Sequence, residues 1–177
     1  NTTPYKQVIM IKEIYFAGGC FWGTQHLIKQ IRGVVATEVG YANGTTANPT
    51  YDEVYTDTTG HVETVRIEYD SEVVSLQLLL EIYFRSIDPT SLNRQGGDSG
   101  TRYRTGIYYT DAEDLTTINE MFKAVQQDYD DEIVVELEPL KTFYAAEEYH
   151  QDYLDKNPTG YCHVPHYLIA IARNMNR

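Results

Sequence analysis

The sequence predicts an α+β fold, a two-layer sandwich formed as a single domain over residues 1–177. Residues 61–70 alternate apolar and polar side chains, which is the period of a half-buried strand. Residues 76–87 are strongly apolar over the length of a helix and end at Asp88-Pro89, where a helix does not continue. A composition of 42% hydrophobic and 23% charged residues is typical of a globular domain with a sizeable core.

The first part of the chain is predicted to contain three strands, one helix and a long loop. The helix has an apolar stripe of Leu27, Ile28 and Ile31, and Gly33 suits its C′ position. The expected elements are a strand at 12–16, this helix, a β-branched strand at 34–40, a polar loop at 41–60 and the strand at 61–70.

The second part continues with a helix at 76–87, a loop at 90–105, a strand at 106–110, an amphipathic helix at 111–129, a strand at 133–137, and a tail with a short helical segment. The order β-α-β-β-α-β, with one more helix and strand appended, matches a ferredoxin-like (split βαβ) core. Two long loops inside a compact domain indicate an active site, because such loops are usually functional.

Charge and cysteine content exclude several functional classes. The net charge of -12, from 14 basic and 26 acidic residues, argues against nucleic-acid binding, which needs clustered Lys and Arg. Two cysteines are too few for a disulfide scaffold or a four-thiolate zinc site. No apolar run has the length of a membrane span. We expect a cytoplasmic protein by default, with a removed targeting segment or a longer parent chain left open.

The first candidate site residue is Cys20, in the stretch "YFAGGCFWG". If the strand ends at Gly18 and Gly19, Cys20 begins the following helix, where free N–H groups and the helix dipole lower a thiol pKa. The alternative is a small buried hydrophobe. Trp22 favours the reactive interpretation, because it projects away from the apolar stripe and suits the wall of a small pocket.

The second candidate is Glu63, which strand parity places on the same face as Val65, Ile67 and Tyr69. A carboxyl group on that apolar face is desolvated, so its pKa rises and it can donate a proton near neutral pH. The alternatives are a side chain that bends to solvent, or one that pairs with Arg102.

Polar residues in the two long loops complete the candidate set. Tyr51 and Tyr103 carry phenol groups that can donate hydrogen bonds to an oxyanion, although most loop tyrosines only cap a core edge. Asp98, between Gly97 and Ser99, is by default a turn residue. The histidines at 61, 150, 163 and 166 stand at no recognisable zinc spacing, so we expect no metal site.

Five blocks of the sequence together resemble the peptide methionine sulfoxide reductase A family. They are "GCFWG", "GYANGTTANPTYDEV", "TGHVETV", "RQGGDSGTRYR" and "YHQDYLDKNPTGYC", which occur in the family's order from about Ile14 to Cys162. Family members often carry Glu where this chain has Gln25, and some carry a further cysteine after the position of Cys162.

The resemblance implies a role for each matched residue. Cys20 is the nucleophile, Phe21 and Trp22 accept the substrate methyl group, Glu63 is the acid with Tyr51, Tyr103 and Asp98 around the sulfoxide oxygen, and Cys162 is the resolving cysteine. The implied reaction reduces the S epimer of methionine sulfoxide, protein-bound and free, through a Cys20–Cys162 disulfide. It further implies thioredoxin as an external reductant. We expect no bound cofactor and a monomer.

Two other functions were weighed from the residues. A cysteine hydrolase would use Cys20 with a histidine base such as His61, but leaves Glu63 and Cys162 unexplained. A non-enzymatic binding module would use the acidic surface and the tyrosine-rich loops.

Overall fold

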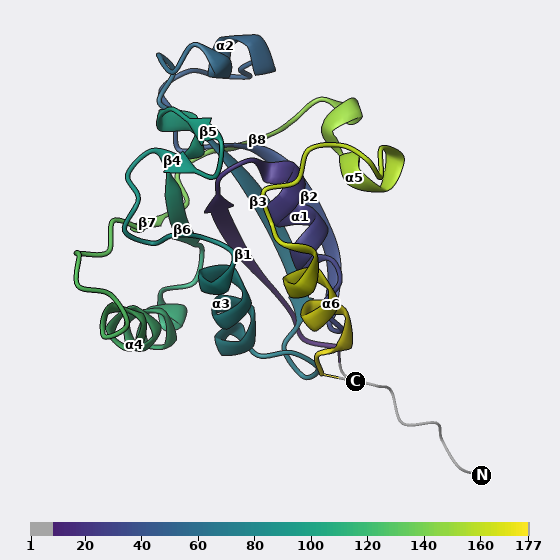
Figure 1. Ribbon diagram of the computed structural model, residues 1–177, viewed down its shortest axis with the longest axis vertical. Helices are drawn as coiled ribbons and strands as arrows, with labels where there is room; N and C mark the ends of the chain where they lie inside the picture. Colours follow the sequence, from purple (N-terminus) through teal and green to yellow (C-terminus); the bar gives the residue numbers. More distant parts are fainter. Residues whose placement is uncertain (1–8, 177) are drawn as a thin grey trace.

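A computed structural model describes residues 9–176, which form a six-stranded sheet in the order β7-β6-β1-β3-β2-β8 (Figure 1). The strands are β1 (Ile11–Gly18), β2 (Val34–Ala42), β3 (Val62–Asp70), β6 (Thr105–Tyr109), β7 (Glu136–Pro139) and β8 (Phe143–Ala145). The inner four, β6-β1-β3-β2, pair antiparallel. Their order along the chain and in the sheet is that of a ferredoxin-like core, so the predicted fold class is confirmed.

Helices pack together beside the sheet (Figure 1). The longer ones are α1 (Phe21–Ile28), α3 (Leu76–Arg85), α4 (Leu115–Gln126) and α6 (His166–Asn174). Helices α1, α3 and α6 contact one another, and α4 packs against α3. Two short helices, α2 (Tyr51–Tyr55) and α5 (Tyr153–Lys156), lie at the end of the sheet where α1 begins (Figure 1).

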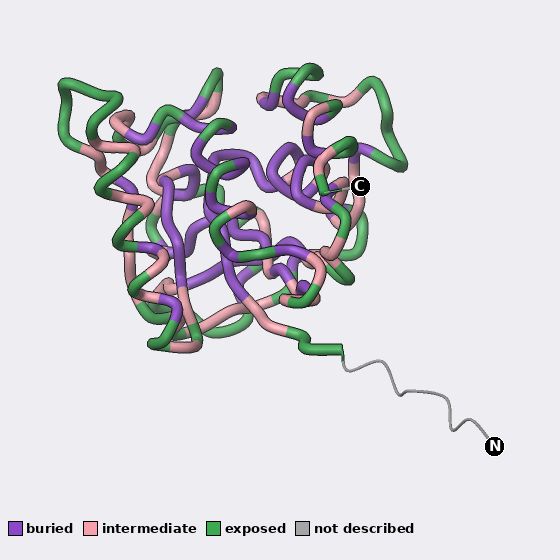
Figure 2. Tube along the Cα trace, turned by 90° about the horizontal axis from the view of Figure 1, so that it is seen from below, coloured by how far each residue is buried: buried purple, intermediate pink, exposed green. Residues whose placement is uncertain are grey.

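Strand alternation divides the buried side chains into two clusters. Along β1, Ile14 and Phe16 join the large core under the helices, whereas Tyr15 and Ala17 join a smaller cluster with Tyr108 on another face. Buried positions therefore run through the middle of the chain trace, with exposed ones at the loops (Figure 2). Because both faces of β1 are buried, the residues that directly follow this strand also lie in the interior.

Some element boundaries differ from the sequence prediction. Helix α1 ends at Ile28, so Gly33 lies beyond it and is not its C′ residue. The last predicted strand, at 133–137, is β7 at Glu136–Pro139. The predicted helix at 111–129 begins as a 3-10 turn at Ala112–Asp114 and continues as α4.

Helices α2 and α6 and strand β8 were not predicted, and neither was the small second sheet of β4 (Arg94–Gln95) and β5 (Asp98–Ser99), which lies in the predicted loop at 90–105. Helix α2 carries a capping box, in which the Thr50 hydroxyl accepts from the Glu53 N–H and the Glu53 carboxylate accepts from the Thr50 N–H. The Thr-x-x-Glu spacing that forms it is readable in the sequence. Strand β8 has three residues and pairs only with the edge of β2, so it has too little periodicity to detect.

The hydroxyl of Tyr83 joins α3 to the sheet at the point where β1 approaches Cys20. It donates to the Ala17 carbonyl at 2.6 Å and accepts from the Gly106 N–H at 3.2 Å. Tyr83 is completely buried. The hydroxyl therefore satisfies polar groups of both β1 and β6 that water does not reach.

We expect Tyr83→Phe to lower the free energy of unfolding by about 1–3 kcal/mol, because it leaves these buried backbone groups without a partner. Urea unfolding measures this loss. Tyr167→Phe is the matched control, because Tyr167 is 63% exposed. A loss no larger than that of the control would contradict the role given to the hydroxyl.

Candidate active site

Cys20 lies at the turn between β1 and α1. Gly19 has a φ of +87°, which reverses the chain after β1, and Cys20 is the N-cap residue of α1. The backbone N–H groups of Trp22 and Gly23 point at the sulfur. The predicted position of Cys20 at a helix N-terminus is therefore confirmed.

The predicted lowering of the Cys20 pKa is wrong for the free protein. Burial raises the pKa of the thiol well above its ordinary value, and the neighbouring Glu63 carboxyl raises it further. The two N–H groups at the helix start offset these effects only in part. Only 7% of Cys20 is exposed, so desolvation outweighs the helix terminus and the resting group is a thiol.

Glu63 lies beside this thiol, on β3. It is 2% exposed and shares the buried face of the strand with Val65 and Ile67, as strand parity predicts. Its Oε1 accepts a hydrogen bond from the N–H of Phe21 at 3.1 Å, and Phe21 follows Cys20 directly. Burial raises the pKa of Glu63 to about 8, so the carboxyl is protonated at neutral pH.

The two alternative interpretations of Glu63 are wrong. The side chain does not reach solvent. Arg102 pairs with Asp57 instead, at 2.6 Å between Nη1 and Oδ2, and acts on Glu63 only as a lesser nearby charge. Glu63 is therefore held as a neutral acid.

The loop residues predicted from the sequence lie around the same point. Burial raises the pKa of Tyr51 to about 12, and the charges of Glu63 and Cys20 add to this effect. Burial also raises the pKa of Tyr103, with Glu63 as its next contribution. Asp98 acts electrostatically on Cys20, Glu63 and Tyr103, and its Oδ2 is buried without a hydrogen-bond partner among the described residues. The structure thus brings these five groups together.

Arginines that the sequence did not single out as site residues hold the loops in place. The Arg102 guanidinium lies 4.3 Å from the ring centroids of both Tyr55 and Tyr103, and the Arg102 N–H donates to Asp57. This pairing ties the end of α2, which begins with Tyr51, to the 3-10 turn at Thr101–Tyr103. Two tyrosines from distant loops are thereby fixed by one ion pair.

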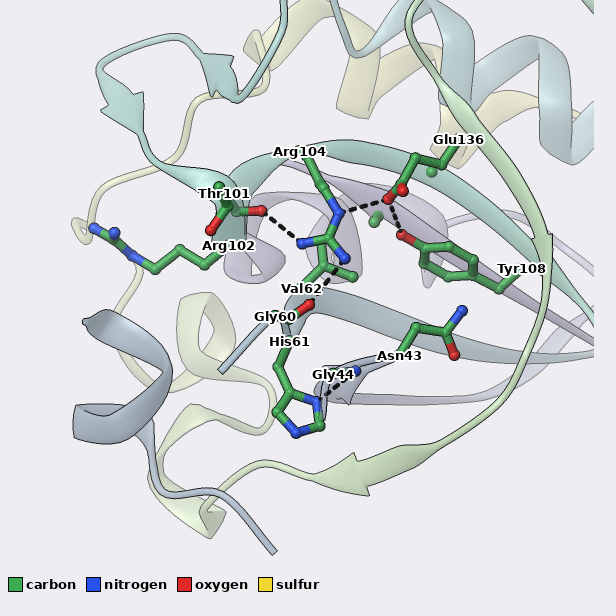
Figure 3. Close-up of polar contacts among 12 residues, drawn as sticks. Asn43, Gly44, Gly60, His61, Val62, Thr101, Arg102, Arg104, Tyr108 and Glu136 are labelled. Carbon is green, nitrogen blue, oxygen red and sulfur yellow. Dashed lines mark hydrogen bonds and ion pairs between the residues drawn. The ribbon is translucent and has the colours of Figure 1, made fainter. Parts of the chain in front are cut away.

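Arg104 forms a second set of contacts that hold these loops (Figure 3). It donates to the carbonyls of Gly60, which precedes β3, and of Thr101, and it pairs with Glu136 at 2.6 Å. Tyr108 donates to the same Glu136 oxygen. Arg104 therefore ties Gly60, which lies just before the strand that carries Glu63, to the turn that carries Tyr103.

His61 does not serve Cys20. Its Nδ1 accepts from the Gly44 N–H at 3.1 Å, as Figure 3 shows, and its Nε2 lies 2.8 Å from the Thr46 carbonyl. Both ring nitrogens are therefore used in holding the loop that follows β2.

Aromatic rings form a wall next to Cys20. Trp22 donates from Nε1 to His150 Nδ1 at 3.0 Å and stacks on Tyr153 with ring centroids 3.6 Å apart. The rings of Phe21 and Tyr51 lie 5.2 and 4.7 Å from that of His150. His150 and Tyr153 fix the orientation of Trp22, a role that the sequence did not predict because the histidines were interpreted only as metal ligands or as a base for Cys20.

Cys162 is half-buried, and its thiol contacts its own segment. The sulfur donates to the Val164 carbonyl at 3.5 Å. It also lines a cavity of about 550 Å³ together with His26, Leu154, Asp155, Pro158, Thr159, Gly160, His166 and Ile169. Both cysteines are free thiols.

Metal and membrane sites were also considered. Within residues 9–176, no group of three or more His, Cys, Asp or Glu side chains is arranged to hold a metal ion. No helix in that part of the chain is long and apolar enough to cross a membrane.

The fold and the site define a thiol-dependent oxidoreductase, in which one cysteine faces a protonated acid and a second cysteine lies on a nearby segment. Residues 12–175 match the family model described as "Peptide methionine sulfoxide reductase". The chain belongs to this family.

Individual relatives agree. The chain is 53% identical to a peptide methionine sulfoxide reductase MsrA of Lachnoclostridium phytofermentans, over 93% of this chain and 99% of that one. Among solved structures, it resembles reduced Mxr1 from Saccharomyces cerevisiae, with a TM-score of 0.81, 38% identity and 92% of each chain covered. It also resembles Mxr1 in complex with Trx2, with a TM-score of 0.59, 27% identity, and 86% of this chain and 90% of that one covered.

The raised pKa of Glu63 has a consequence for stability. The folded carboxyl titrates at about 8 and the unfolded one at the ordinary value of 4.5. Between these values the unfolded chain has lost a proton that the folded chain keeps, so Glu63 lowers stability progressively as pH rises through this window.

We therefore expect Glu63→Gln, which keeps the acceptor for the Phe21 N–H, to raise the free energy of unfolding by about 1–3 kcal/mol at pH 7.5. The gain should shrink below pH about 5, where the carboxyl is protonated in both states. Urea unfolding at the two pH values measures it, with Glu68→Gln on the other face of β3 as control. An equally stable or weaker Gln variant at pH 7.5 would mean that Glu63 is not held neutral.

Proposed function

We propose that this chain reduces the S epimer of methionine sulfoxide, in proteins and as the free amino acid, with Cys20 as nucleophile and Glu63 as acid. The observation that carries the proposal is the hydrogen bond from the Phe21 N–H to a buried, neutral Glu63. This hydrogen bond holds the proton donor, Glu63, beside Phe21, which directly follows Cys20.

The first step joins two requirements of sulfoxide chemistry. The sulfoxide sulfur needs a soft nucleophile, and its oxygen leaves only when protonated. Cys20 attacks the sulfur while Glu63 protonates the oxygen. The attack forms a bond between the two sulfurs. The protonated oxygen then passes to the Cys20 sulfur as the substrate S–O bond and the bond between the sulfurs break, which leaves Cys20 as a sulfenic acid and the substrate as a thioether.

The surrounding groups stabilise the charges that develop in this step. The N–H groups of Trp22 and Gly23 receive the negative charge on the Cys20 sulfur. Tyr51 and Tyr103 stay protonated because their pKa values are raised, so they are available as donors to the sulfoxide oxygen.

The same geometry supports selection of one epimer. The methyl group packs against Phe21 and the oriented ring of Trp22, and the oxygen faces Glu63. With Cys20 approaching the sulfur, the remaining substituent has one position, so only one configuration fits.

The second step regenerates the enzyme. Cys162 attacks the Cys20 sulfenic acid, which forms a disulfide and releases water. An external dithiol then reduces the disulfide and is itself oxidised. The similarity to a structure of Mxr1 in complex with Trx2 supports thioredoxin as that reductant. No bound cofactor is required in this scheme, and the cytoplasmic location and monomeric state stay predictions.

The hydrolase alternative is not favoured. His61 is engaged with Gly44 and Thr46 and cannot act as a base for Cys20. The binding-module alternative leaves the buried acid beside the thiol without a use.

For the acid role, we expect Glu63→Gln to slow methionine formation in a single turnover by roughly 10²-fold while substrate still binds. The rate of the unmodified protein should fall as pH rises above about 8, where Glu63 loses its proton. Rapid-quench measurement of methionine, with Glu68→Gln as control, gives both quantities. An unchanged rate in the Gln variant would refute the acid role.

For the resolving role, we expect Cys162→Ser to release one equivalent of methionine and then stop with thioredoxin as reductant. Cys20 should remain as a sulfenic acid, which dimedone traps and mass spectrometry detects. Sustained turnover of this variant with thioredoxin would remove Cys162 from the mechanism.

A further inference from the structure

The segment that carries Cys162 lies against the turn that carries Cys20. Tyr161 precedes Cys162, and its hydroxyl lies beside Gly97 and Asp98 at the active site. His163 follows Cys162 and reaches the end of β1. The two neighbours of Cys162 are thus held at the Cys20 site while the Cys162 thiol lines the separate cavity.

His163 is held by one hydrogen bond and by close packing. Its Nε2 donates to the Gly18 carbonyl at 2.8 Å. Burial lowers the pKa of the ring, so it is neutral at neutral pH and its proton lies on Nε2. This bond fixes the segment to the residue two positions before Cys20.

The ring fits because residues on both sides of Cys20 lack side chains. A Cβ atom at Gly23 would lie 2.8 Å from His163 Nδ1, and one at Gly19 would lie 3.3 Å from Nε2. Gly19 and Gly23 therefore form a glycine notch that holds the imidazole. The notch accounts for the glycine at position 23, whereas Gly19 is also required by its φ of +87° and by the Gln95 Cβ, 2.8 Å from an added Cβ.

In this arrangement Cys162 is a free thiol that is not bonded to Cys20. A disulfide requires the two Cβ atoms to lie about 3.5–4.5 Å apart with their bonds converging. The Cys162 thiol instead donates to Val164 and lines the cavity with Leu154 and Ile169. Bonding to Cys20 breaks this contact with Val164 and repositions the backbone directly next to His163.

We propose that His163 is a positioning residue that stabilises the dithiol form of the enzyme by occupying the glycine notch, and that it leaves the notch when the Cys20–Cys162 disulfide forms. The inference rests on the proposed role of Cys162. The chemistry is unchanged: the Cys20 sulfenic acid and the Cys162 thiol give the disulfide and water. What His163 adds is an interaction lost on oxidation and regained on reduction, which favours regeneration of the thiols.

The first test is the equilibrium between dithiol and disulfide in a dithiothreitol redox buffer. A lost buried hydrogen bond should shift the equilibrium of His163→Ala toward the disulfide by about 3–10-fold. At about 30 mV per tenfold change, the midpoint potential becomes more negative by about 15–30 mV. His163→Gln, whose amide can donate to the Gly18 carbonyl, should recover most of the shift. Tyr167→Ala, at an exposed position on α6 outside the cavity lining, should show none.

A His163→Ala potential equal to that of the unmodified protein, or less negative, overturns the proposal. Loss of stability alone does not move this ratio, because both redox forms share the variant. If the oxidised unmodified protein forms no Cys20–Cys162 disulfide, the proposed function fails instead, and the two failures are thereby distinguished.

The second test needs no variant and therefore does not depend on folding of a mutant. Nitrogen NMR of the histidine-labelled protein should show His163 with its proton on Nε2 and slow exchange in the dithiol form. In the disulfide form that protection should be lost, because the bond to Gly18 is broken. Identical signals in the two forms would overturn the proposal.

Discussion

The hydrogen bond between the Phe21 N–H and Glu63 joins the two halves of the active site. It links β3, which carries the acid, to the first turn of α1, which begins at Cys20. The Phe21 N–H by itself favours the ionised carboxyl, but burial outweighs it and keeps the group neutral, since an unpaired carboxylate in an apolar interior costs several kcal/mol. Burial therefore raises the pKa of Glu63 and keeps its carboxyl protonated.

Sheet pairing fixes this contact, and ionic contacts complete it. Strand β1 pairs with β3 and leads into Cys20, so the thiol and the acid arise from neighbouring strands. The tyrosines come instead from loops, which have no ladder to hold them. Arg102 and Arg104 supply that restraint by binding Asp57, Glu136 and backbone carbonyls. These contacts hold the tyrosine-bearing loops against the sheet.

The sequence predicted those features that depend on local periodicity. The buried face of Glu63 follows from the alternation of β3, and the place of Cys20 follows from the glycines after β1. The Thr50 capping box was readable but was passed over. The Cys20 pKa was predicted in the wrong direction, because the helix terminus is a local feature whereas burial is not. Residues more than 120 positions away, such as His150 and His163, help to enclose this turn.

The raised pKa values of Cys20 and Glu63 agree with a reaction in which protons pass only between these two groups and the substrate. At rest both groups are neutral, so the interior holds no unpaired charge from either of them. In the proposed reaction Glu63 gives one proton to the sulfoxide oxygen and the Cys20 thiol gives one up, so the acid can be restored with the proton that the sulfur releases. The oxygen finishes as a sulfenic acid, and no proton is taken from the solvent. A site that supplies its own proton can be closed to water, which is the condition under which a buried acid keeps its raised pKa.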